Sequence, residues 1–217
     1  MELRDREPLA TPGVCSRDRF ERRPIASADM EMLGSASIGL LERADDQLRR
    51  IISRVSQAQA DLPTPCSDVN VRALVNHIVY DLQTFTAMIS GGQRGSPHVD
   101  LLGDDWLAAY SLSADALLAT WRSRGTGGTL TSRMGELPAT WALGQHASDL
   151  VVHAWDVARA TRNTEELDPE LAEAALAWGR QNLKPELRGQ AFGPEVPVPD
   201  NAPAYERLAG FFGREPG

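Results

Sequence analysis

Two histidines and one aspartate have the types and the spacing that could hold a metal ion. His77 ends the segment VRALVNH (71–77), and Asp149 precedes His153 by four residues in the segment DLVVHAWD (149–156). Positions i and i+4 share one face of a helix, with Cβ atoms about 5–6 Å apart, so an Asp and a His placed there can bind one divalent cation. A third donor from another helix would leave coordination positions open for water or substrate. The pattern predicts a helical metalloprotein, most simply an enzyme.

Three further side chains bear on this candidate site. His146 lies seven residues before His153, about 10 Å along a helix axis, which is an awkward separation for one shared ion. Asp156 follows His153 by three residues and could orient its imidazole as a hydrogen-bond acceptor. Asp81 lies four residues after His77, so it is a candidate fourth ligand, a partner of that histidine or a plain surface charge.

The same residues also fit structural roles. His153 could be a hydrogen-bonded histidine at the core boundary with Asp149 as a solvated charge, and His77 could be structural as well. Cys66 follows a proline at an expected helix N-terminus, where the helix dipole lowers a thiol pKa, so it is either a reactive thiol or a small buried residue. His98 lies in a loop and is expected at the surface.

Helices are expected to position these residues. Gly91 and Gly92 end one helix, Ser67 or Asp68 could begin it, and Asp168 caps another that has proline at its first position. Residues 125–138 form a loop with a short extended piece near 129–133. Apolar residues at three- and four-residue spacing predict helices over 37–59, 67–90, 104–124, 140–161 and 169–183. The expected fold is all-α, a four-helix bundle with a long crossover loop and a C-terminal extension.

Length and composition bound the organisation of the chain. Its 217 residues suit one domain, which we place at 34–217. Residues 1–33 are expected to form a disordered tail, because positions 1–29 hold six arginines, six acidic residues and no apolar period. Cys15 and Cys66 form no C-x-x-C pair, so a reducing cytoplasm is the expected compartment.

Several functional classes are disfavoured by the sequence. A formal charge of −8 argues against general binding to nucleic acid. No apolar run is long enough for a membrane span, and no secretory signal is apparent. The chain has no G-x-G-x-x-G, Walker A, H-E-x-x-H or G-x-S-x-G motif, so nucleotide binding and serine hydrolysis lack a signature.

Beyond these patterns, longer segments resemble a known family. They are PTPCSD (63–68), VRALVNH (71–77), DLVVHAWDVARAT (149–161), FGPEVPVP (192–199) and the ending with GREP (213–216). Together they resemble the actinobacterial metal-binding proteins related to the N-terminal domain of mycothiol-dependent maleylpyruvate isomerase, in the DinB-like superfamily of four-helix bundles. The resemblance runs from about residue 34 to the C-terminus.

The resemblance implies a divalent metal, typically zinc, with nickel, iron or manganese as alternatives. Its ligands would be His77, Asp149 and His153. The resemblance also implies a low-molecular-weight thiol such as mycothiol as cosubstrate. Asp81 and Asp156 are candidates for supporting roles from their spacing alone. This sequence departs from the family pattern at Asp149, usually Glu, at Val69, usually Trp, and at Arg162, usually Gly.

Three functions follow as hypotheses. The first is a metal-dependent transferase or isomerase that uses a mycothiol-type thiol on an unknown substrate. The second is a metal-dependent hydrolase with Asp81 or Asp156 as general base. The third is a non-catalytic protein that binds a metal or ligand within the bundle. A small-molecule thiol or substrate is the expected partner, and a homodimer is left open.

Overall fold

The computed structural model describes residues 37–216, apart from positions 67, 68, 94, 97, 133, 134, 164, 165, 184, 186, 187 and 189–191. The tail expected over 1–33 therefore lies outside the described residues. So do Ser67 and Asp68, the two expected helix caps.

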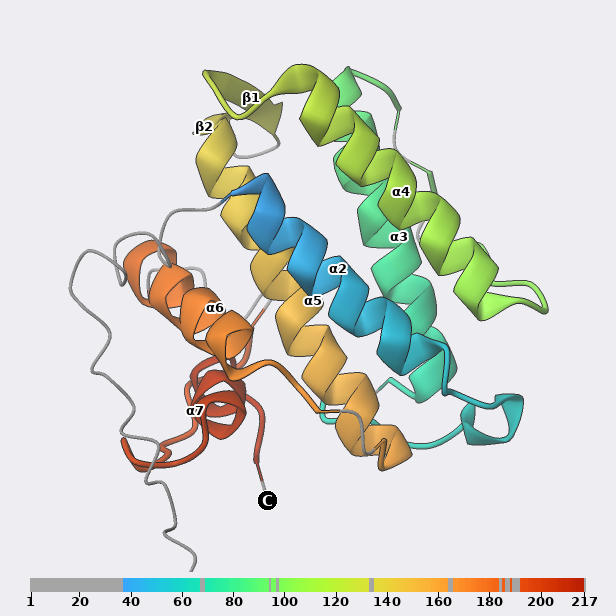
Figure 1. Cartoon of the computed structure of the whole chain (residues 1–217), viewed down its shortest axis with the longest axis vertical. Coiled ribbons are helices and arrows are strands. Elements are labelled where there is room, and N and C mark those ends of the chain that lie inside the picture. Colours follow the sequence, from blue (N-terminus) through green and yellow to red (C-terminus); the bar gives the residue numbers. More distant parts are fainter. Residues whose placement is uncertain are drawn as a thin grey trace, which may run out of the picture.

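Four long helices form a bundle in the described part of the chain (Figure 1). They are α2 (Ile38–Ile52), α3 (Val71–Ser90), α4 (Trp106–Arg124) and α5 (Ala139–Thr161). Helix α2 packs against α4 and α5, and α3 packs against the same two helices. Consecutive helices α2 and α3 are therefore diagonal neighbours, as are α4 and α5, and the connections between them cross the ends of the bundle. The expected all-α fold, with a crossover, is confirmed.

Both crossing connections contain local structure that the sequence pattern did not predict. Helix α2 was expected to reach residue 59, but it ends at Ile52, and a short 3₁₀ helix, η1 (Gln57–Gln59), follows. Ser56 and Gln59 form a capping box that begins η1, and this local hydrogen bonding competes with continuation of the α-helix. The second connection holds an antiparallel hairpin, β1 (Thr129–Ser132) and β2 (Gly135–Pro138), where one extended piece was expected.

The ends of α3 and α5 are defined by their caps. The side chain of Asn70 accepts a hydrogen bond of 2.9 Å from the Ala73 N–H, so Asn70 is the N-cap of α3. Helix α3 ends at Gly91 with φ of 73°, as expected. Helix α5 ends at Arg162 with φ of 52°, and no other described non-glycine residue has positive φ. Glycine adopts this left-handed conformation without strain, which agrees with the glycine that the resemblance implies at this position.

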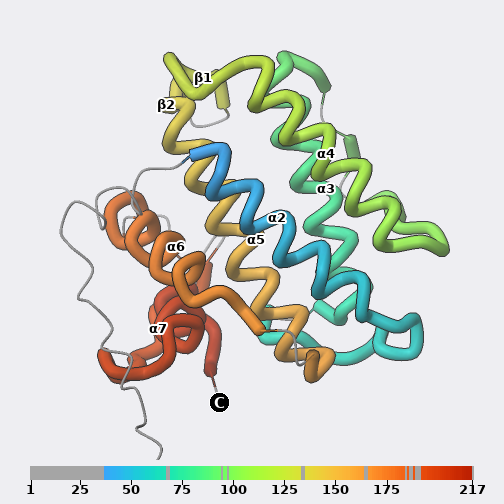
Figure 2. Tube along the Cα trace, viewed as in Figure 1, coloured from blue at the N-terminus to red at the C-terminus, as the bar shows by residue number. Residues whose placement is uncertain are grey.

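Two further helices lie beside the bundle (Figure 2). Helix α6 (Pro169–Asn182) packs against α5 and against α7 (Ala204–Phe211). The amide of Gln47 on α2 donates to the Tyr205 hydroxyl and accepts from the Asp168 N–H, both at 2.7 Å. The C-terminal extension is therefore joined to the bundle by buried hydrogen bonds as well as by apolar contacts. No described helix is long and apolar enough to cross a membrane.

Candidate metal centre

The two histidines singled out from the sequence face each other across the α3–α5 interface. The imidazole rings of His77 and His153 lie edge to face, with centroids 5.5 Å apart and an interplanar angle of 84°. Asp149 lies one turn before His153 on α5. His153 is 9% exposed, whereas the His77 side chain is about half exposed. The fold thus brings the predicted ligands from two helices into one region.

His77 is paired with Asp81 on its own helix. Its Nε2 lies 3.2 Å from Asp81 Oδ2. Two ligand atoms of one tetrahedral ion with bonds of 2.0–2.1 Å lie about 3.3 Å apart, so this separation suits a hydrogen bond and shared ligation equally well. Burial lowers the pKa of His77, although Asp81 opposes the shift. The ring is therefore neutral at pH 7, the form that binds metal.

The surroundings of Asp149 disfavour the ionised form of its carboxyl group. Burial raises its pKa to about 7, and Asp81 adds to the shift, whereas His153 and Arg214 oppose it. Among the described residues the Asp149 carboxyl has no hydrogen-bond partner. A cation beside it would favour the ionised form. The chemistry of this donor set, two imidazoles and a carboxylate, fits a divalent transition metal such as zinc.

Asp156 holds the second histidine in place. Its Oδ2 lies 3.1 Å from His153 Nδ1, and its carboxylate accepts from Arg214 Nε at 3.2 Å and Nη2 at 2.9 Å. Burial alone would raise the pKa of Asp156, but the hydrogen bond to His153 and the charge of Arg214 together hold it below its usual value. The ionised carboxylate accepts a hydrogen bond from Nδ1–H, which leaves the Nε2 lone pair of His153 available to bind a metal ion.

Arg214 is the residue of this region that the sequence analysis missed. It follows α7, its Nη1 donates to the Phe212 carbonyl at 2.8 Å, and its side chain is buried. The Asp156–Arg214 pair joins positions 58 residues apart, so no local spacing indicates it. Its one signal is its place in the GREP ending that resembles the family.

Cys66 lies close to both His153 and Asp156. Its sulfur, one donor atom of His153 and one of Asp156 all lie within 4.8 Å of one another, and no other such group of three occurs among the described residues. The donors of His77, Asp149 and His153 are therefore spaced more widely than that. Burial raises the pKa of the Cys66 thiol, the opposite of the shift expected at a helix N-terminus, so Cys66 is a protonated, partly buried thiol.

A small cavity lies beside the candidate ligands, between α3 and α5. Its volume is about 10 Å³, the space of about one water molecule. Its walls are partly apolar and partly polar. They comprise Ile78, Asp81, Leu82, Phe85, His146, Asp149, Leu150 and His153. The cavity can hold an ion or a single oxygen atom beside Asp149 and His153.

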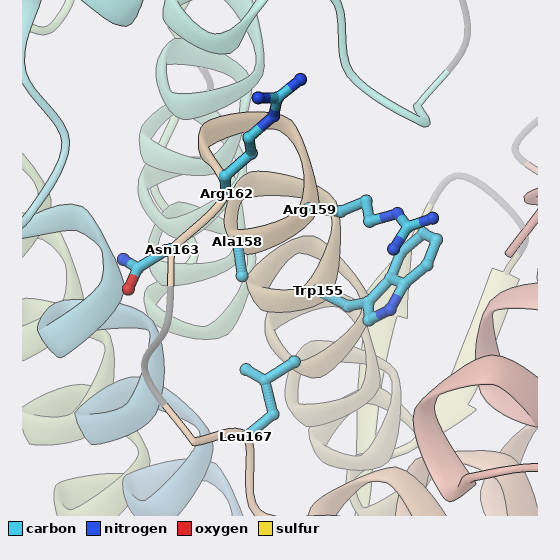
Figure 3. A pocket seen from close by; sticks show the side chains of 6 residues that line it. All are labelled: Trp155, Ala158, Arg159, Arg162, Asn163 and Leu167. Atoms are coloured by element: carbon cyan, nitrogen blue, oxygen red, sulfur yellow. The ribbon is translucent and has the colours of Figure 1, made fainter. Parts of the chain in front are cut away.

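Larger surface grooves lie near the C-terminal end of α5. One of about 540 Å³ is lined by side chains from α5 and from the segment that leads to α6 (Figure 3). A second, of about 690 Å³, shares Arg159 and Arg162 with it. None of the predicted metal donors lines either groove. His98 is exposed in its loop, as expected.

The arrangement defines a class: an all-α, DinB-like bundle domain with a histidine–carboxylate cluster between two of its helices. The chain matches the family described as mycothiol maleylpyruvate isomerase N-terminal domain over residues 41–158, more than half of its length. It belongs to that family. The matched region includes His77, Asp149, His153 and Asp156, whereas Arg214 lies beyond it.

Individual relatives agree with this membership. Two uncharacterised proteins of Mycobacterium tuberculosis are each 32% identical to the chain over 177 residues, covering 80% of this chain and 94% of theirs. The crystal structure of the mycothiol-dependent maleylpyruvate isomerase aligns with a TM-score of 0.51 at 14% identity, covering 67% of each chain. A histidine-to-alanine variant of that isomerase aligns with a TM-score of 0.50. At this identity the structural likeness shows a shared fold.

Proposed function

We propose that the protein binds one divalent metal ion through His77, Asp149 and His153 and uses a mycothiol-type thiol in a transfer or isomerisation reaction. The family and its isomerase members support the thiol. Zinc is the metal that the donor set favours, with nickel, iron or manganese as alternatives. The substrate that receives or undergoes the reaction is open.

The observation that carries the proposal is the state of Asp149. A partly buried carboxyl without a hydrogen-bond partner is costly to ionise, and proteins accept such groups chiefly at functional sites. Because its pKa is about 7, a cation beside the carboxyl group would shift it from partly to fully ionised at neutral pH. The carboxyl faces the same small cavity as His153, where such a cation would lie.

Each residue of the candidate site would have its own role. A bound divalent ion lowers the pKa of a thiol at neutral pH and so supplies a nucleophile. His77 and His153 would hold the ion through ring nitrogens, and Asp149 would offset part of its positive charge. Asp156 and Arg214 keep the His153 ring in one orientation and one tautomer.

Metal-dependent hydrolysis is less well supported by the surroundings of the two base candidates. Asp81 pairs with His77, and Asp156 is bound by His153 and Arg214. A general base needs a lone pair aimed at the water that it deprotonates, and both carboxylates are already used within the site. A non-catalytic role would instead require a closed, four-coordinate metal without exchangeable water.

Thiol binding can be tested on cobalt-substituted protein. Mycothiol should change the visible absorption bands of the cobalt ion and add a sulfur-to-metal charge-transfer band. The disulfide form of mycothiol is the matched control, because it has the same body without a free sulfhydryl group. An unchanged spectrum at millimolar mycothiol, in protein shown to contain cobalt, would contradict the thiol role.

A further inference from the structure

We propose that His146 donates a hydrogen bond from its Nε2–H to a carbonyl or carboxylate oxygen of a ligand bound in the α3–α5 cavity. Trp121 is the positioning residue that keeps the proton on Nε2. The inference deepens the proposed function, since this oxygen would lie beside the candidate metal ligands. The Nε2–H donor is present with or without a metal, so this inference and the proposed function can fail separately.

The tautomer of His146 follows from its partner. The indole Nε1–H of Trp121 lies 3.2 Å from His146 Nδ1, and an indole nitrogen can only donate. Nδ1 must therefore be the unprotonated acceptor. Burial lowers the pKa of His146 to about 3, so the neutral ring carries its one proton on Nε2 at physiological pH.

That Nε2–H has no acceptor in the described part of the protein. His146 is 1% exposed, and its Nε2 is one of a few buried polar side-chain atoms without a partner there. Folded proteins satisfy nearly all buried donors, because an unsatisfied one loses its hydrogen bonds to water without replacement. An orphan donor at the edge of a cavity points to a ligand atom that completes it.

The ring is held in this orientation on two sides. The Phe85 ring lies against the imidazole, with centroids 3.5 Å apart and an interplanar angle of 34°. Trp121 holds the Nδ1 edge. His146, Asp149 and His153 line the same cavity, so the donor belongs to the region of the candidate ligands.

The cavity restricts what the donor can meet. Its volume of about 10 Å³ admits one oxygen-sized group rather than a whole substrate. A neutral N–H selects an acceptor and rejects an ammonium group. The apolar walls formed by Ile78, Leu82 and Leu150 strengthen a hydrogen bond made there, because they keep the local dielectric constant low. A carbonyl oxygen meets all these conditions. A carboxylate oxygen also meets them when a cation offsets the charges of Asp81 and Asp149, which line the same cavity.

The tautomer and the contact can be observed directly by NMR. Protein labelled with ¹⁵N-histidine, metal-free and zinc-loaded, is titrated with pyruvate, a small acid with both acceptor types, and His146→Gln assigns the resonances. We expect the Nε2–H tautomer in both forms and a saturable shift of the His146 Nε2 resonance with pyruvate. A proton on Nδ1, or an Nε2 resonance unmoved by pyruvate, would overturn the inference. An Nε2 resonance that already shows a hydrogen bond to water and does not change with pyruvate would assign the cavity to a resident water molecule. That result would also overturn the inference.

Variants separate a ligand contact from a packing role. His146→Leu should weaken pyruvate binding by about tenfold or more, and His146→Gln, which keeps an N–H donor, should restore part of the loss. Trp121→Phe should yield a mixture of His146 tautomers. Trp106→Phe is its matched control, because the Trp106 Nε1–H has no partner among the described residues and its loss should leave the His146 spectrum unchanged.

Elemental analysis of the same samples separates the two proposals. A protein that takes up no metal but still shows the His146 shift with pyruvate would leave this inference standing and remove the proposed function. A zinc-loaded protein whose His146 resonances do not change with pyruvate would overturn this inference and leave the proposed function standing. Equal pyruvate affinity in His146→Leu and the parent protein would also exclude the contact.

Discussion

Asp149 combines a partly buried position with a carboxyl group that has no hydrogen-bond partner among the described residues. Its folded-state pKa of about 7 lies above the unfolded value of about 3.9, so the folded metal-free protein binds more protons between these values. The stability that this group contributes is present below pH 4 and is lost as the pH rises through 7. Without a bound cation, Asp149 is therefore a destabilising residue at pH 8.

Replacing the Asp149 carboxyl by an amide should remove this destabilisation of the metal-free protein. We expect Asp149→Asn to raise the free energy of unfolding of the metal-free protein by about 1–3 kcal/mol at pH 8, and to change it little at pH 4. Urea denaturation at both pH values measures this difference. Asp115→Asn is the control, since Asp115 is an exposed partner of Arg49 and should change stability by less than about 1 kcal/mol. Equal stability of Asp149→Asn and the parent at pH 8 would show that the ionised Asp149 carboxylate does not destabilise the metal-free protein.

Arg214 has the opposite role, because it compensates a buried charge. Replacing it by methionine leaves Asp156 ionised, buried and without its cation, which should cost about 3–5 kcal/mol of stability. Thermal and chemical denaturation measure the loss. Arg207→Met is the matched control: Arg207 pairs with Glu173 in a more exposed position, and its loss should cost about 1 kcal/mol or less. Similar losses in the two variants would argue against a special role for Arg214.

At the scale of residues, local spacing predicted part of the candidate site. The i, i+4 spacing of Asp149 and His153 and the i, i+3 spacing of Asp156 fix which side chains share a helix face, and the structure places them so. The pairing of Asp156 with Arg214 and of His146 with Trp121 depends on which helices pack together. That information is not local, so spacing within one helix cannot supply it.

At the scale of helices, the contact between α5 and α6 depends on the absence of a side chain. A Cβ at Gly144 would lie 2.2 Å from Trp178 Nε1, well inside van der Waals contact. Trp178 is buried on α6 and also stacks near Trp141 of α5, with ring centroids 5.5 Å apart. The close approach therefore fixes how the C-terminal extension lies against the bundle.

This close approach makes a direct prediction. Gly144→Ala should destabilise the protein by about 1–3 kcal/mol through overpacking, despite the better helix propensity of alanine. Denaturant unfolding followed by tryptophan fluorescence measures the change. Gly127→Ala serves as the control, because a Cβ there meets nothing within 4 Å and no positive φ is required. A stabilised Gly144→Ala protein would contradict the observed packing of α5 and α6.

Helix boundaries show where periodicity is informative and where it is not. Helix α5 matches its expected range closely, and α3 ends where expected, because long apolar stripes and end signals such as Gly91 agree. Helix α3 begins at Val71, four residues later than expected, because Asn70 supplies the N-cap. Helix α2 ends early because a local capping box begins a separate turn. The second strand of the hairpin was missed, since a four-residue strand carries too short a pattern to recognise.

At the scale of the whole molecule, the crossing order of the bundle creates the candidate site. Because α3 packs directly on α5, side chains 72 and 76 residues apart, Asp149 and His153 relative to His77, lie at one interface. The family match covers this bundle, and the C-terminal extension adds Arg214 from outside the match. Five of the six described α-helices could be predicted from the sequence, whereas α7 lies in the extension where no helix was expected. The bundle arrangement itself rested on the family resemblance.

Metal content is the measurement that tests the central claim most directly. Elemental mass spectrometry of the purified protein should find about one equivalent of zinc, nickel, iron or manganese per chain, and His77→Ala and His153→Ala should each lose it. His98→Ala, at an exposed histidine in a loop, should retain the metal of the parent. A parent protein that stays empty after incubation with each of these metals, or variants that retain full metal, would contradict the proposed site.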